Sequence, residues 1–110
     1  MNRDFLEMIK TRRSTRSFKP DSIPEDLLDA VLEAGTYAPT GMNRQSPVII
    51  AVSDKKYREK LSKLNAAIMG VDKDPYYGAP TVVLVLADPS ANTVVEDSRC
   101  VLETQLLAAH

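Results

Sequence analysis

The sequence has very few of the residues on which many catalytic and metal sites depend. Among its 110 residues there is one cysteine (Cys100), one histidine (His110) and no tryptophan. A single cysteine excludes an intrachain disulfide and a cysteine metal cluster, and a single histidine argues against Ser/His/Asp catalysis. No metal-ligand spacing and no glycine-rich phosphate loop is present. Cys100 lies in an apolar helical pattern, so we expect it to be buried as a small hydrophobic residue.

Long hydrophobic runs and an excess of charge are also missing. The net charge is −1, which argues against a general nucleic-acid or acidic-lipid partner. Residues 1–13 alternate charged and apolar side chains, and no stretch is long enough to span a bilayer. We therefore expect a cytoplasmic protein that binds neither nucleic acid nor membrane, with enough apolar residues for the core of one small domain.

Hydrophobic spacing predicts four helices and two strands. The helices are expected over about 2–12, 24–35, 54–68 and 90–109, and the strands over 48–52 and 82–86. Because both strands are unbroken apolar runs, we expect them to be buried on both faces and to need further neighbours. The last helix reaches His110 with no glycine cap or polar tail. Residues 1–110 are therefore expected to be the amino-terminal part of a longer domain, or to depend on a partner subunit.

A basic cluster directly follows the first predicted helix. Its members are Arg12, Arg13, Ser14, Arg16 and Lys19. One interpretation is that the first arginines complement the carboxyl end of the helix dipole and the others are simply solvated. The other is an anion site, because the guanidinium group presents a planar fork of donors that matches phosphate oxygens.

Turn-forming and small polar residues fill the segment from Thr36 to Pro47. Pro39 fixes φ, Gly41 permits positive φ, and Asn43 tolerates left-handed geometry. The segment reads either as an ordinary helix-to-strand connection or as a shaped loop. In the second case its side chains could hydrogen-bond a flat heterocycle through Thr40, Asn43, Arg44 and Gln45.

Four further polar positions carry less information. Asn65 falls on the third predicted helix, where an amide has either a structural partner or a ligand. Tyr76 and Tyr77 lie in the loop predicted over 70–80, where they could anchor the loop or line a cleft. His110 is given no functional role.

Taken together, the segments Thr11–Phe18 and Ala38–Pro47 resemble the two amino-terminal signatures of the FMN-dependent nitroreductase family. The resemblance extends to Leu64–Gly70, to Tyr77–Pro80 and to the final helix, and it covers essentially the whole chain. It implies an α+β nitroreductase-like fold with a mixed, mostly antiparallel sheet flanked by helices. Residues 1–110 would be the amino-terminal portion of that domain.

The resemblance also implies residue roles. Arg12, Arg13 and Ser14 would hold the phosphate and ribityl chain of FMN, Arg16 would approach the pyrimidine side of its ring, and Asn65 would hydrogen-bond the ring edge. A loop from the other subunit of a homodimer would reach the flavin through Pro39, Thr40, Gly41, Asn43 and Gln45.

The function that follows from this resemblance is hydride transfer. NADH or NADPH would reduce FMN and leave, and a nitroaromatic or quinone-like acceptor would then take the hydride in a ping-pong reaction, with the flavin rather than a protein group carrying the chemistry. Two alternatives remain open at this point. One is a non-catalytic dimerisation or interaction module, and the other is a flavin enzyme of the same fold with different chemistry, such as a dehydrogenase or a dehalogenase.

Overall fold

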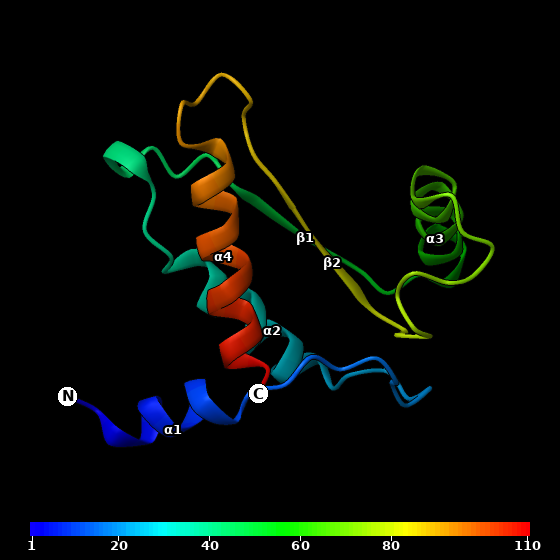
Figure 1. The fold of residues 1–110 in the computed structure, drawn as a ribbon, viewed down its shortest axis with the longest axis horizontal. Helices are drawn as coiled ribbons and strands as arrows, with labels where there is room; N and C mark the ends of the chain where they lie inside the picture. Colours follow the sequence, from blue (N-terminus) through cyan, green and yellow to red (C-terminus); the bar gives the residue numbers. More distant parts are fainter.

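The computed structural model describes residues 1–110, which form four α-helices, one short 3₁₀ helix and two strands (Figure 1). In chain order these elements are α1 (Arg3–Thr11), α2 (Glu25–Thr36), η1 (Gly41–Asn43), β1 (Val48–Val52), α3 (Lys55–Met69), β2 (Val82–Leu86) and α4 (Val94–Ala108). Every helix and strand predicted from the sequence is present. The last helix begins four residues later than predicted, because Asp88 accepts a hydrogen bond from the Ser90 amide and holds residues 88–91 in a turn.

Local capping explains where two of the helices begin. The Asn2 side chain accepts hydrogen bonds from the amides of Asp4 and Phe5 at the start of α1. The Asp54 side chain does the same for Lys56 and Tyr57 at the start of α3. These bonds satisfy amides that have no partner within the helix.

The two strands form an antiparallel ladder with Val48 opposite Leu86 and Val52 opposite Val82. Helices α2 and α4 pack against each other, α2 contacts β1 and α4 contacts β2. Gly35 lies in this contact, where an added Cβ would come within 2.8 Å of both Gln105 Nε2 and Ile49 Cδ1. Glycine at this position therefore lets α2, α4 and β1 approach closely.

The core is thin, since only 7 of the 110 residues are buried. The prediction that the strands are buried on both faces is wrong for this chain, because Val48 is 56% exposed and Leu86 is 54% exposed. Each strand has only the other as a hydrogen-bonded neighbour. None of the helices is long and apolar enough to cross a membrane.

The predicted burial of Cys100 is also wrong, because its side chain is exposed. The buried positions of α4 are Asp97, Val101 and Gln105, which follow one another at a spacing of four residues. Cys100 precedes Val101 by one position, which turns it about 100° away from this buried stripe.

Candidate functional site

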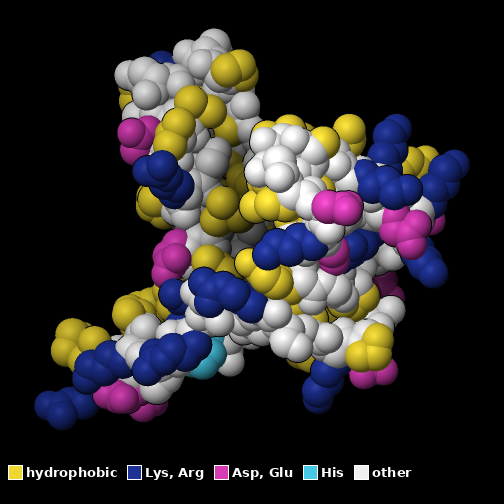
Figure 2. Space-filling view, turned by 45° about the vertical axis from the view of Figure 1, so that its right-hand side comes forward, with side chains coloured by type: hydrophobic (Ala, Val, Ile, Leu, Met, Phe, Trp, Pro, Cys, Tyr) yellow, Lys and Arg dark blue, Asp and Glu magenta, His cyan; other side chains and the backbone are white.

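The basic cluster lines a cavity of about 580 Å³ next to the carboxyl end of α4. Figure 2 shows Lys and Arg side chains running along the surface beside the only histidine of the chain. The cavity is lined by Arg12, Arg13, Ser14, Thr15, Arg16, Phe18, Tyr77, Leu106, Ala109 and His110. The structure thus brings four of the predicted site residues together, and it adds residues from two distant parts of the chain.

The arginines of this cavity differ in what they contact. Arg13 Nη1 donates to the carbonyl oxygens of Lys10 at 2.7 Å and Arg12 at 2.9 Å, so it caps the carboxyl end of α1. No side-chain hydrogen bond or ion pair engages the guanidinium of Arg12 or Arg16. Arg13 thus complements the carboxyl end of α1, as the first interpretation expects, whereas the guanidiniums of Arg12 and Arg16 have no partner in the protein.

Tyr77 reaches the same cavity from the loop between α3 and β2. Its backbone is left-handed, with φ of 53°, an uncommon conformation for a bulky residue. The turn that contains it is built on Asp74, whose carboxylate accepts hydrogen bonds from the amides of Tyr76 at 3.1 Å and Gly78 at 2.8 Å. This arrangement presents the Tyr77 ring to the basic cavity.

Asp74 also joins this turn to α3. Its carboxylate accepts hydrogen bonds from Arg58 and from Ser62 Oγ, and Arg58 in turn donates to the carbonyl of Ala79 at 2.8 Å. The hydrogen bond from the Arg58 guanidinium holds the pKa of Asp74 well below its usual range, and the bonds from Ser62 and the turn amides lower it further. Asp74 is consequently a carboxylate at neutral pH.

His110, for which no role was predicted, also lines this cavity. Its Nε2 atom is 2.8 Å from Thr11 Oγ1, so the last helix contacts the end of the first. No signal in the sequence indicated this pairing, because the two residues lie 99 positions apart.

The second group of predicted residues forms a loop at the other end of α4. Three of its residues, Met42, Asn43 and Gln45, have left-handed φ between 52° and 54°. The Gln45 amide donates to Thr40 Oγ1 at 3.0 Å, and Gln45 Nε2 donates to Asn43 Oδ1 at 2.9 Å. The segment has the defined backbone geometry expected of a shaped loop.

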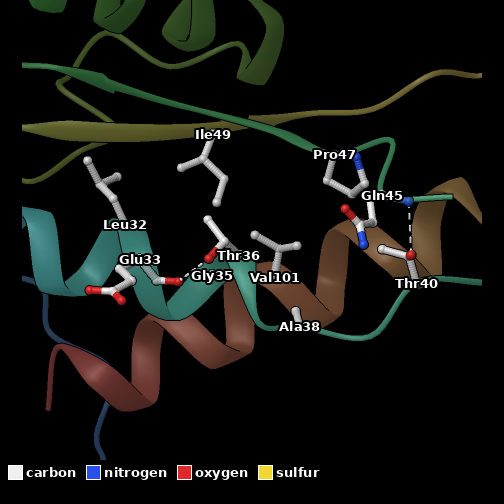
Figure 3. A pocket seen from close by; sticks show the side chains of 10 residues that line it. All are labelled: Leu32, Glu33, Gly35, Thr36, Ala38, Thr40, Gln45, Pro47, Ile49 and Val101. Atoms are coloured by element: carbon white, nitrogen blue, oxygen red, sulfur yellow. Dashed lines mark hydrogen bonds between the residues drawn. The ribbon is translucent and has the colours of Figure 1, made fainter. Parts of the chain in front are cut away.

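A second cavity, of about 410 Å³, lies beside this loop. Figure 3 shows the side chains of Thr40, Gln45 and Pro47 at one end of it and those of Leu32 and Glu33 at the other. Of the predicted site residues only Thr40 and Gln45 line it. Asn65, half-buried on α3, lines neither cavity.

The two groups of predicted residues are far apart in one chain. The loop contacts Thr93 and Asp97 at the amino end of α4, whereas Leu106 and Ala109, near its carboxyl end, line the basic cavity. Figure 1 shows η1 and α1 at opposite ends of α4. At 1.5 Å per residue, the helix separates Asp97 from Leu106 by about 14 Å. A single chain therefore does not close the loop over its own basic cavity.

The profile of the nitroreductase family matches residues 9–110 of this sequence. The chain belongs to the nitroreductase family. The resemblance drawn from the two amino-terminal segments is thereby confirmed.

Solved nitroreductases have the same fold. The Bacteroides fragilis nitroreductase with bound FMN superposes with a TM-score of 0.87 at 34% identity, covering 99% of this chain and 65% of that one. The Desulfitobacterium hafniense nitroreductase with bound FMN gives a TM-score of 0.86 at 31% identity, with the same coverage of 99% and 65%. The expected α+β nitroreductase-like fold is confirmed.

A protein of Methanothermobacter thermautotrophicus, provisionally named as an NADH dehydrogenase or NAD(P)H nitroreductase, is 32% identical over 111 residues. That match covers 97% of this chain but 56% of the relative. The chain thus spans between about half and two thirds of the length of these nitroreductases.

Proposed function

We propose that residues 1–110 form the amino-terminal portion of a nitroreductase-like domain and supply the FMN-binding residues of an NAD(P)H-dependent oxidoreductase that acts as a homodimer. The observation that carries the proposal is the cavity of about 580 Å³ in which the guanidiniums of Arg12 and Arg16 have no partner in the protein. Related nitroreductases contain bound FMN, and another relative is named for NAD(P)H.

The donors around the basic cavity fit a phosphate-bearing cofactor. Guanidinium groups bind phosphate oxygens through charge-assisted hydrogen bonds, and the hydroxyl of Ser14 adds a further donor. Arg12 is the main phosphate ligand in this proposal, because Arg13 already uses Nη1 on the carbonyls of α1. The volume lies within the range of about 300–1,000 Å³ typical of small-molecule sites.

A second copy of the chain completes the site in this proposal. The loop and the basic cavity lie at opposite ends of α4, so the loop that covers a flavin comes from the other subunit. Exposed apolar surface supports such a dimer, since Phe5, Leu27 and Ile68 are 46%, 54% and 86% exposed. The loop residues assigned to the flavin of the other subunit are Pro39, Thr40, Gly41, Asn43 and Gln45, and Asn65 is assigned to the ring edge.

Bound FMN would take a hydride from NADH or NADPH and pass it to a small electron-poor acceptor, such as a nitroaromatic or a quinone, in a ping-pong sequence. The protein's part is to hold the cofactor and to adjust its charge. Arg16 supplies a fixed positive charge, which favours the more negative, reduced form of the ring. The cytoplasmic location expected from the sequence stays a prediction.

The test compares two flavins that differ only in the phosphate. The wild type should bind FMN, be yellow, and lose its visible absorbance when NADH or NADPH is added. Arg12→Ala should weaken FMN binding by about 1.5–3 kcal/mol, the contribution of a charged hydrogen bond, and should leave riboflavin binding unchanged.

Arg99→Ala is the matched control, because Arg99 is an exposed arginine on α4 that does not line the basic cavity. An equal loss for both flavins in Arg12→Ala would contradict the phosphate assignment. A wild type that binds neither flavin would contradict the proposal as a whole and favour a non-catalytic module.

A further inference from the structure

Asp97 is a buried carboxylate whose hydrogen bonds connect α4 to the loop. Its side chain is 3% exposed and has no ion-pair partner. Oδ1 accepts from the Gly41 amide at 2.9 Å, and Oδ2 accepts from Thr93 Oγ1 at 3.0 Å. Burying a carboxylate without a cation is costly, and its place in the first turn of α4 offsets only part of that cost.

The loop that Asp97 contacts has a strained backbone. Met42, Asn43 and Gln45 are all left-handed. Asparagine tolerates this conformation, whereas for Met42 and Gln45 it costs roughly 1–2 kcal/mol each. Such geometry persists only when surrounding contacts determine it, and it is concentrated at functional sites. The hydrogen bonds between Thr40, Asn43 and Gln45 stay inside the loop. The bond from the Gly41 amide to Asp97 is the one that ties residues 40–45 to another element.

The same contact leaves no room for a side chain at position 41. A Cβ on Gly41 would overlap Thr93 Oγ1 and would lie 2.9 Å from Thr93 Cγ2. The backbone of the loop therefore lies directly against the start of α4, at the point where the Asp97 carboxylate receives its amide. The sequence predicts that Gly41 is needed because it permits positive φ. In the structure it is needed because a side chain would clash with Thr93.

We infer that Asp97 is the positioning residue of the flavin-contacting loop: by holding the Gly41 amide it fixes the loop conformation that covers the FMN bound to the other subunit. The inference rests on the proposed function and adds to it a residue that touches neither cofactor nor substrate. Because the loop approaches the ring and not the phosphate, losing Asp97 weakens FMN and riboflavin alike.

The first experiment measures the affinity of the full chain for both flavins. Asp97→Ala should bind FMN and riboflavin at least roughly tenfold more weakly, the loss expected for a charged hydrogen bond. Asp97→Asn keeps an oxygen that can accept from the Gly41 amide, so its loss should be smaller. Glu96→Ala, at the exposed neighbouring position on the same helix turn, should bind both flavins as the wild type does.

The second experiment distinguishes a positioning role from a general structural one. Subunits carrying Asp97→Ala and subunits carrying Arg12→Ala, with different affinity tags, are combined and the mixed dimers are isolated. If the loop of each subunit covers the flavin of the other subunit, one site of the mixed dimer combines the Arg12→Ala cavity with the loop of the Asp97→Ala subunit and carries both defects. The other site combines an unchanged cavity with an unchanged loop and is intact. The mixed dimer should then bind one FMN with wild-type affinity, whereas each parent dimer binds none as tightly.

The possible results separate the inference from the proposed function. Unchanged flavin affinity in Asp97→Ala overturns the inference while the proposed function stands. A mixed dimer with no tight site overturns the inference together with the proposed loop contact between subunits, and leaves FMN binding by the basic cavity in place. A wild type that binds neither flavin overturns both. Should Asp97→Ala fail to fold, Gly41→Ala decides, because its Cβ clashes with Thr93 and displaces the Gly41 amide from Asp97. A several-fold loss for both flavins supports the inference, and wild-type affinity overturns it.

Discussion

The basic cavity and the loop at the opposite end of α4 are built by different physical means. In the cavity, long charged side chains such as Arg16 are exposed and have few partners. In the loop, three left-handed residues and one buried carboxylate determine the backbone. Coulomb attraction tolerates mobile groups because it acts over a distance, whereas hydrogen bonds to a flat ring require fixed donors and acceptors. If both regions contact FMN as proposed, one ligand is recognised by a solvated charge site and by a rigid loop.

This comparison has a direct consequence for ionic strength. Exposed charges are screened by salt, with a Debye length of about 8 Å at 0.15 M. We therefore expect the FMN contact of the basic cavity to weaken as salt is raised and the contact of the loop to change little. Each variant below tests one side of this contrast.

The largest effect is expected for Arg16→Ala. If Arg16 faces the flavin ring, losing it removes about 1.5–3 kcal/mol of stabilisation from the reduced form, which lowers the two-electron reduction potential by roughly 30–65 mV. Spectroscopic titration against a reference dye measures the potential. Arg12→Ala is the control and should leave it nearly unchanged. An unaltered reduction potential in Arg16→Ala would show that Arg16 does not stabilise the reduced flavin ring.

Gly41→Ala should be nearly as severe at the other end of α4. The added Cβ overlaps Thr93, and relieving such a clash displaces the loop at a cost of about 1–3 kcal/mol. We expect equal losses in FMN and riboflavin affinity that do not depend on salt. Adding Thr93→Ala removes the two nearest atoms and should recover part of the loss. A loss confined to FMN would show that the loop acts on the phosphate instead.

Asp74→Asn tests the turn that places Tyr77 in the wall of the basic cavity. Replacing the carboxylate weakens the hydrogen bonds from Arg58, Ser62 and the turn, and should reduce the free energy of unfolding by about 1–2 kcal/mol. The native pKa of Asp74 is depressed, so its contribution is complete above the unfolded value of about 3.9 and declines progressively as pH falls from there toward the native pKa, which makes it smaller at pH 3 than at pH 7. Denaturant titrations at pH 7 and pH 3 measure this difference. If the free energies of unfolding of wild type and variant differ as much at pH 3 as at pH 7, the ionised carboxylate is not the cause of the difference.

The smallest effect is expected for Arg13→Ala. Its Nη1 donors serve the carbonyls at the end of α1, so its loss should cost about 0.3–1 kcal/mol of stability through the helix end. FMN affinity should fall much less than in Arg12→Ala. Equal losses of FMN in the two variants would mean that both arginines grip the phosphate, and the contrast between them would disappear.

Local patterns in the sequence were sufficient for most of the fold. Apolar spacing identified α1 through α4 and both strands, and the caps at Asn2 and Asp54 follow from side chains that satisfy neighbouring amides. Burial was less predictable: Cys100 and Val48 were both expected inside and are both exposed. A pattern shows which residues could be buried, but the packing partners decide which ones are.

For the candidate site, too, some features followed from the sequence and others only from the tertiary structure. The sequence alone determined the identity and order of the arginines, the turn residues of the loop and the family to which the chain belongs, because these depend on residue type and short spacing. Only the tertiary structure decided that the two groups lie at opposite ends of α4, that Arg13 is engaged by α1 while Arg12 is available, and that Asp97 holds Gly41. The first and the last of these depend on contacts between residues far apart along the chain, which no local pattern encodes. The Arg13 contact is local, but residue type alone does not say which of the neighbouring arginines turns back to the helix end.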